Sequence, residues 1–156
     1  MADEQIKSPS EYASLPAGTR VSYGPTGGTL ATAQLLQSAM AIGATGKKGT
    51  FMDVTRLIDT DRKYMADMGE GEDKTLVFID DPSDAAQMAL LTSADAKETK
   101  LFYMQFPNKR IAEVELVLSG WSLQAVDSPS GKVLQVEVYG KQNRIKWSVA
   151  PADGGA

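Results

Sequence analysis

The sequence predicts a mainly β fold, a β-sandwich or partial barrel with one short α-helix covering one opening. Three observations support this class. Apolar and polar residues alternate over long stretches near the C-terminal end, the other apolar runs are short and bounded by glycine or proline, and one segment carries helix signals. At 156 residues, with 42% hydrophobic and 23% charged residues, the chain is suited to one globular domain. We expect that domain at residues 19–148, between a flexible N-terminal arm at 1–18 and a flexible C-terminal tail at 149–156.

Short apolar runs predict the strands of the first two thirds of the chain. The segment 32–42 stays open between a helix, which Leu35, Leu36 and Met40 favour, and a sheet edge, which the flanking glycines favour. The other expected strands are 19–23, stopped by Gly24-Pro25, then 49–57, 74–79, and 100–106, ended by Pro107.

The clearest prediction is a long β-hairpin, with strands at 111–126 and 132–146 joined by a turn at Ser128-Pro-Ser-Gly131. Period-two alternation gives each strand one buried face and one polar face. The side chains expected in the core are Val114, Leu116, Leu118, Leu134, Val136 and Val138. Those expected on the opposite face include Glu113, Glu115, Gln135 and Glu137.

One helix is expected after the apolar run that ends at Ile79. Asp81 is placed to cap it, Pro82 suits the first helical position, and Asp84 complements the positive end of the helix dipole. An apolar stripe of about three turns should then face the core, broken at Thr92-Ser93. Its residues are Ala85, Met88, Ala89 and Leu91.

The composition argues against an enzyme. The chain has no cysteine and no histidine, so it lacks thiolate chemistry and the usual general base and metal ligand. The net charge of −4 argues against a tight nucleic-acid clamp. No apolar run approaches the about 18 residues of a membrane span, and no secretory signal is visible at the start. We therefore expect no cofactor, no small-molecule ligand and no membrane partner.

Three patterns were weighed as sites and favour simpler explanations. Asp59, Asp61, Asp67 and Glu70 match four positions of a calcium loop, but Lys63 and Tyr64 occupy positions five and six, so a solvated acidic loop is favoured. Gly46-Lys-Lys-Gly-Thr50 lacks the spacing of a phosphate loop and suits a turn. Asp80-Asp81 could supply paired carboxylates, but Asp81 is expected to cap the helix.

One ordered string of motifs resembles a known family. It consists of Asp53-Val-Thr-Arg-Leu-Ile-Asp-Thr60, Tyr64, Gly69-Glu70, the apolar strand 76–79 and Asp81-Pro-Ser-Asp-Ala-Ala-Gln87, followed by the strand 100–106 and the hairpin. Over residues 53–141 the chain resembles the major tail tube proteins of long non-contractile-tailed bacteriophages. The resemblance implies a tail-tube-like fold whose copies form hexameric rings. The rings would stack into a tube that holds the tape-measure protein and later passes DNA.

The resemblance also implies the setting of the protein. Its partners would be its own copies, the tape-measure protein, and the tail terminator and tail-tip proteins, in a virion tail assembled in the host cytoplasm. Two alternatives remain open: a related assembly protein, such as a secretion-type tube ring or a tail terminator, and more remotely a glycan-binding β-domain.

Two groups of residues are expected to serve assembly. The acidic segment 57–71 is longer than the about 2–5 residues of an ordinary hairpin link, so we expect it to contact other subunits. Its residues named for that role are Asp59, Thr60, Asp61, Arg62, Lys63, Tyr64, Asp67 and Glu70. A negative wall would repel DNA phosphates, so Glu113, Glu115, Gln135 and Glu137 are expected to face the lumen.

Overall fold

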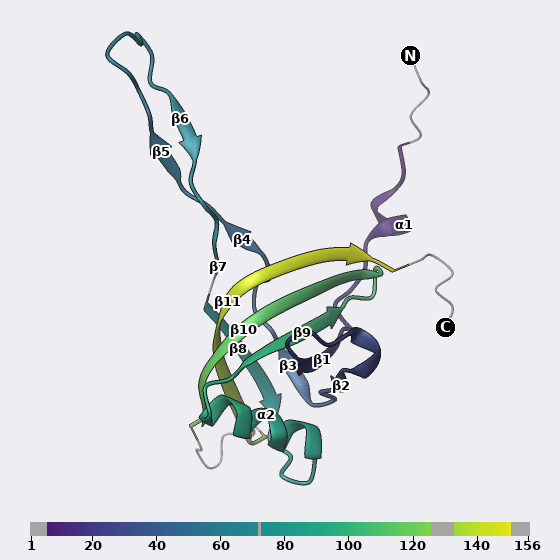
Figure 1. Ribbon diagram of the computed structural model, residues 1–156. Helices are drawn as coiled ribbons and strands as arrows, with labels where there is room; N and C mark the ends of the chain where they lie inside the picture. The colour runs from purple at the N-terminus through teal and green to yellow at the C-terminus, as the bar shows by residue number, and fades with distance from the viewer. Residues whose placement is uncertain (1–5, 72, 126–132, 151–156) are drawn as a thin grey trace.

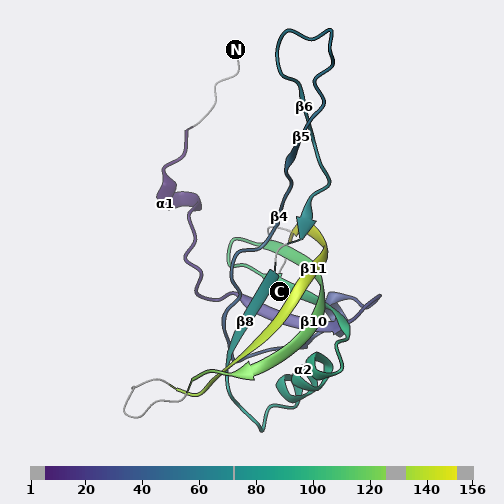
Figure 2. The same ribbon diagram turned by 90° about the vertical axis from the view of Figure 1, so that its left-hand side faces the viewer.

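The computed structural model describes residues 6–71, 73–125 and 133–150, and a curled antiparallel sheet forms its body (Figure 1). Seven strands lie in the order β2-β1-β9-β10-β11-β8-β3. A two-stranded ribbon projects from one end of this sheet, and helix α2 packs near the other end (Figures 1 and 2). The elements are α1 (Pro9–Tyr12), β1 (Arg20–Pro25), η1 (Leu30–Thr32), β2 (Gln34–Leu35), β3 (Ala39–Ala41), β4 (Lys47–Lys48), β5 (Phe51–Asp53), β6 (Tyr64–Ala66), β7 (Glu70–Gly71), β8 (Asp73–Ile79), α2 (Ala85–Asp95), β9 (Thr99–Gln105), β10 (Arg110–Leu123) and β11 (Gln135–Val149).

The predicted fold class is confirmed, in its partial-barrel form. The seven-stranded sheet curls into a half-barrel, and α2 contacts its central strands β10 and β11. Every strand pair of this sheet is antiparallel. A curled antiparallel sheet can bury one face and leave the other polar, which is the pattern that the sequence shows.

The long hairpin is confirmed in β10 and β11, which pair from Arg110 opposite Val149 to Leu123 opposite Val136. The predicted turn at 128–131 lies outside the described residues. The register shifts twice along the pair, and the second shift falls beside Gly120, whose φ of 148° suits glycine. Bulges of this kind increase the local twist of a strand pair, which helps the sheet to curl.

The core lies between the sheet and α2. Five of the six side chains predicted for the hairpin core are at most 1% exposed, and burial of each stabilises the fold by about 1.5–3 kcal/mol. Leu134 was wrongly assigned to the core, because β11 begins one residue later and Leu134 is 50% exposed. The buried cluster comprises Val21, Tyr23, Leu36, Leu76, Phe78, Leu90, Leu91, Ala94, Phe102, Met104, Ala112, Val114, Leu116, Leu118, Val136 and Val138.

The predicted cap of the helix was wrong: Asp81 was expected to cap it, but Asp84 does. Helix α2 begins at Ala85, and Asp84 caps it by accepting a hydrogen bond from the Ala86 amide at 3.1 Å. Asp81 instead closes a turn, in which its Oδ1 accepts from the Ser83 amide at 3.0 Å and from the Ser83 hydroxyl at 2.6 Å. Both aspartates can cap, and the loop that leaves β8 decides which one does.

The predicted apolar stripe of α2 was also largely wrong. Leu91 is buried, but Met88 is 43% exposed, and the helix continues through Thr92-Ser93 to Asp95. The buried face is Gln87, Leu90, Leu91, Ser93 and Ala94. The sequence pattern did not reveal this face because one of its residues, Gln87, is polar. The Gln87 amide is fully buried and hydrogen-bonded to Ile79 O, Asp81 N and Ser38 Oγ.

The open segment 32–42 is resolved as sheet edge. It forms the short strands β2 and β3 at opposite edges of the sheet, with buried Leu36 between them. The strand predicted at 49–57 was wrong in length and place, because β5 covers Phe51–Asp53 and pairs with β6 in the ribbon. At the C-terminal end, regular pairing continues to Val149.

Within the described ranges, no helix is long and apolar enough to cross a membrane.

Candidate functional site: the projecting ribbon and the polar face of the sheet

The most distinctive surface feature is the projecting ribbon, residues 47–71, which extends far beyond the body (Figures 1 and 2). Strands β4 and β7 pair at its base, and β5 and β6 pair further out. Two hydrogen bonds continue the ribbon beyond these pairs, from Asp67 N to Thr50 O at 2.7 Å and from Val54 N to Lys63 O at 2.9 Å. The ribbon is therefore an ordered hairpin that stands away from the core.

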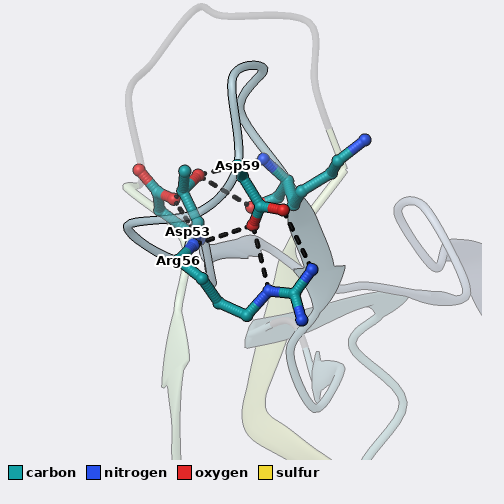
Figure 3. Close-up of polar contacts among 5 residues, drawn as sticks. Asp53, Arg56 and Asp59 are labelled. Atoms are coloured by element: carbon teal, nitrogen blue, oxygen red, sulfur yellow. Dashed lines mark hydrogen bonds and ion pairs between the residues drawn. The ribbon is translucent and has the colours of Figure 1, made fainter.

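Polar contacts fix the tip of the ribbon (Figure 3). Arg56 donates to both carboxylate oxygens of Asp59, at 3.2 Å from Nε and 2.9 Å from Nη2, and its amide donates to the same carboxylate. Thr55 donates to Asp53 through its hydroxyl and its amide. These hydrogen bonds lower the pKa of Asp59 and of Asp53 below the usual value, because they favour the charged carboxylates.

The eight residues predicted to contact other subunits all lie in this ribbon. Asp59 to Lys63 form the tip, Tyr64 begins β6, Asp67 follows β6, and Glu70 lies on β7. The Asp59 carboxylate forms an ion pair with Arg56. Across the described parts of the chain, no three acidic side chains gather into a cluster that could hold a metal ion.

The ribbon also exposes apolar side chains that the sequence analysis did not single out. Leu57 and Ile58 at the tip are fully or largely exposed, and so are Phe51 and Met68 nearer the base. The prediction missed Phe51 and Leu57 because it placed 49–57 in a strand, and it missed Ile58 and Met68 because it named mainly polar side chains in the segment 57–71. The available signal was the glycines at the base of the ribbon. Gly46 and Gly49 flank β4, Gly69 precedes β7, and Gly71 ends it.

A buried polar joint sets the direction in which the ribbon leaves the body. Lys74, only 3% exposed, donates from Nζ to Ala44 O and Thr45 Oγ1, each at 2.6 Å, and to Gly43 O at 3.4 Å. On the other side, Gly71 lies so close to β11 that an added Cβ would stand 1.9 Å from the Gln142 carbonyl oxygen. The joint therefore fastens both strands of the ribbon to the sheet.

The four side chains predicted to face a lumen share one face of the sheet. Glu113 and Glu115 on β10, and Gln135 and Glu137 on β11, alternate with buried residues and lie opposite the core. Tyr139 fixes Glu137 by donating to its carboxylate at 2.7 Å. We call the surface that these residues share the polar face.

The polar face carries both signs of charge. Lys146 lies opposite Glu113, and Arg144 lies opposite Glu115, so both basic side chains share this face. Arg144 also reaches Glu113, with 4.0 Å between Nη1 and Oε2. The uniformly negative wall assumed from the glutamates was therefore an incomplete description, because it left out the residues paired with them.

One part of the polar face is covered. Tyr103 lies opposite Glu113 on β9, and its hydroxyl donates to Gly28 O at 3.0 Å, where the loop after β1 folds over the sheet. Burial raises the pKa of Tyr103, and the nearby carboxylate of Glu113 raises it further. The loop after β1 thus covers the polar face at β9, while the polar face of β10 and β11 stays more open.

Comparison with known proteins gives one family. The sequence pattern of the phage tail tube protein family matches residues 14–150. No curated protein sequence matches the chain significantly.

Solved structures with the same fold include chains of a sheath–tube complex, a baseplate and a tail. A chain of the extended sheath–tube complex of an extracellular contractile injection system is 12% identical, with a TM-score of 0.71, covering 92% of this chain and 99% of that one. A chain of the six-fold symmetrised baseplate of the anti-feeding prophage is 9% identical, with a TM-score of 0.67 and coverages of 88% and 98%. A chain of the tail of an empty gene transfer agent particle is 13% identical, with a TM-score of 0.65 and coverages of 89% and 100%.

Proposed function

The chain belongs to the phage tail tube protein family, structural proteins of the virion tail, and we propose that its copies form hexameric rings that stack into the conduit for DNA. The role is structural rather than catalytic. The tape-measure protein would occupy the conduit during assembly in the host cytoplasm, and tail-terminator and tail-tip proteins would bind its two ends. The projecting ribbon would be the assembly element for this role.

The ribbon is the observation that carries the proposal. An isolated two-stranded hairpin is marginally stable in water at best, because it buries little apolar surface. This one holds Leu57, Ile58 and Phe51 in solvent, with exposures of 77% or more. A surface of that kind is expected to be buried by a partner. Copies of the same chain are the partner that a tube provides.

One further observation supports rings of six, and a second supports lateral contact between copies. The gene transfer agent tail with this fold was refined with C6 symmetry, and the anti-feeding prophage baseplate was six-fold symmetrised. The curled sheet also has open edges, because β2 covers only Ser22 and Tyr23 of β1, while β3 covers only the last part of β8. Strand edges of this kind are satisfied when neighbouring copies pair with them.

We propose that the polar face, with Glu113, Glu115, Gln135 and Glu137, lines the conduit. Opposite charges that pair within the wall, such as Arg144 with Glu113, would hold few phosphates tightly, so passing DNA would still slide.

Because the chain has no cysteine, single cysteines report on exposure without background. Glu137→Cys should react with a small maleimide in assembled tubes but not with a bulky one. Equal reaction of both reagents would place Glu137 on the outside.

A direct test removes the ribbon and keeps the body. Residues 51–66 would be replaced by a short Gly/Ser link from Thr50 to Asp67, whose backbone O and N are 2.7 Å apart. Asp59 is half-buried in its ion pair with Arg56, and the other replaced residues are exposed, so thermal unfolding should change little. Negative-stain microscopy should show tubes for the native chain and none for the shortened chain.

The same experiment separates the alternatives. Native chain that stops at single rings under all salt and protein concentrations would favour a terminator. Native chain that stays monomeric, with tail partners present, would contradict the proposal. Tubes formed equally well by the shortened chain would show that the ribbon does not connect subunits, while leaving the tube function itself intact.

A further inference from the structure

The end of the long hairpin carries an exposed apolar patch. Trp121 and Leu123 lie two residues apart on β10 and therefore point to one side of the strand. Leu123 is opposite Val136 on β11, and Leu134 precedes Val136 by two residues, so Leu134 falls on the same side. The three side chains are 36%, 46% and 50% exposed. We call Trp121, Leu123 and Leu134 the end patch.

The end patch lies at the opposite end of the molecule from the projecting ribbon. Strand β8 begins at Asp73, directly after the ribbon, and ends at Ile79, which is opposite Gln135. The next amide, Asp80 N, donates to Leu134 O at 2.9 Å. Figures 1 and 2 both show the ribbon at one end of β8 and the end of the hairpin at the other.

Both ends carry charged side chains that could form ion pairs. Lys47 and Lys48 form β4 at the base of the ribbon, and both are exposed. Asp80 and Asp81 adjoin the end patch and are partly exposed. The base also carries acidic residues, because Glu70 lies opposite Lys48 on β7 and Asp73 begins β8. Lys47 and Lys48 would still attract Asp80 and Asp81 of a copy stacked in the same direction.

We propose that the end patch receives the projecting ribbon of a second copy stacked head to tail, with Lys47 and Lys48 of that copy against Asp80 and Asp81. The inference rests on the proposed function and adds to it the surface that accepts the ribbon. A contact between two different surfaces that repeats along an axis gives an open stack, and it requires donor and acceptor at opposite ends. The lower ribbon, with Phe51 and Met68 exposed, supplies apolar side chains close to the lysines.

The apolar part of the contact is tested by Leu134→Ser. The control is Ile79→Ser, because Ile79 is 41% exposed at the same end of the sheet but on the polar face. Leu134→Ser should leave rings and melting temperature nearly unchanged while slowing tube elongation at least tenfold by light scattering. Ile79→Ser should elongate like the native chain. Equal elongation of both variants would overturn the assignment of the patch.

The charged part is tested by reversal and rescue. Lys47→Glu with Lys48→Glu, and separately Asp80→Lys with Asp81→Asn, should each stop at single rings in negative stain. Asn at position 81 keeps an oxygen to accept from the Ser83 amide, so the turn before α2 is preserved. The chain with all four changes should form tubes again, because the two changed positions of the ribbon base are then negative and position 80 is positive.

The outcomes separate this inference from the proposed function. Variants that lose rings as well as tubes would place these residues between neighbours in one ring and overturn the axial contact. A four-residue variant that folds and forms rings but does not elongate would overturn the charge pairing. Native chain without tubes would instead contradict the proposed function itself.

Discussion

Replacing Lys74 by methionine tests whether the buried joint holds the ribbon in place. Methionine keeps the apolar stem but removes the donor of two 2.6 Å hydrogen bonds, to Ala44 O and Thr45 Oγ1. Hydrogen bonds to a charged group contribute about 1.5–3 kcal/mol each. Removing the ammonium also relieves its desolvation cost, so we expect a net loss of about 1–3 kcal/mol.

That loss corresponds to a fall in melting temperature of about 2–4 °C per kcal/mol for a chain of this size. The change should be local as well. Amides of residues 43–48, which lead into the ribbon, should exchange hydrogen faster, while those of β10 and β11 keep their protection.

Urea unfolding and hydrogen exchange measured on the same samples give both readouts. Lys146→Met is the control, because Lys146 is an exposed lysine on the polar face and its loss should change stability by less than about 0.5 kcal/mol. If Lys74→Met unfolds at the same urea concentration as the native chain and amide exchange at residues 43–48 is unchanged, Lys74 does not hold the ribbon in place.

Two further predictions concern close contacts of the body. Gly71→Ala should lower the free energy of unfolding in urea by about 1–3 kcal/mol, because the added Cβ would meet the Gln142 carbonyl. Gly24→Ala is the control and should leave that free energy nearly unchanged, because the nearest atom to its added Cβ is 3.8 Å away. Burial, and then Asp84, raises the pKa of Tyr23, so the native chain should lose stability as pH rises above about 10. Tyr23→Phe should lose less over that range in thermal melts at pH 8 to 11, although losing the Ala86 hydrogen bond costs about 1 kcal/mol at neutral pH. An equal alkaline loss in both chains would contradict this reading.

The tip of the ribbon offers an acid-range prediction. Arg56 lowers the pKa of Asp59, so the ion pair at the tip should persist below the ordinary aspartate pKa and open only as pH falls through the lowered pKa. Carboxylate signals of Asp59 followed by NMR should titrate below the ordinary aspartate range. Titration of Asp59 within that range would show that the pair does not form in solution.

The sequence by itself determined the features that depend on local alternation. Val114, Leu116, Leu118, Val136 and Val138 are buried because period-two patterning assigns alternate side chains to one face, whatever lies across from it. The same rule placed Glu113, Glu115 and Glu137 on the polar face. The family resemblance, carried by motifs between 53 and 141, agrees with the family match over residues 14–150. Whether the polar face lines a lumen stays a prediction.

Tertiary structure alone decided the features that depend on distant residues. Asp81 and Asp84 are equally able caps, and the choice followed from how β8 leads into α2 and how buried Gln87 binds the loop. The charge balance of the polar face depended on the strand register that brings Arg144 and Lys146 beside the glutamates. The place where the ribbon leaves the body likewise depends on two contacts, of Lys74 with the loop at Ala44 and of Gly71 with β11 at Gln142. No local pattern encodes these contacts, because the partners lie about 30 and 71 positions away in the chain.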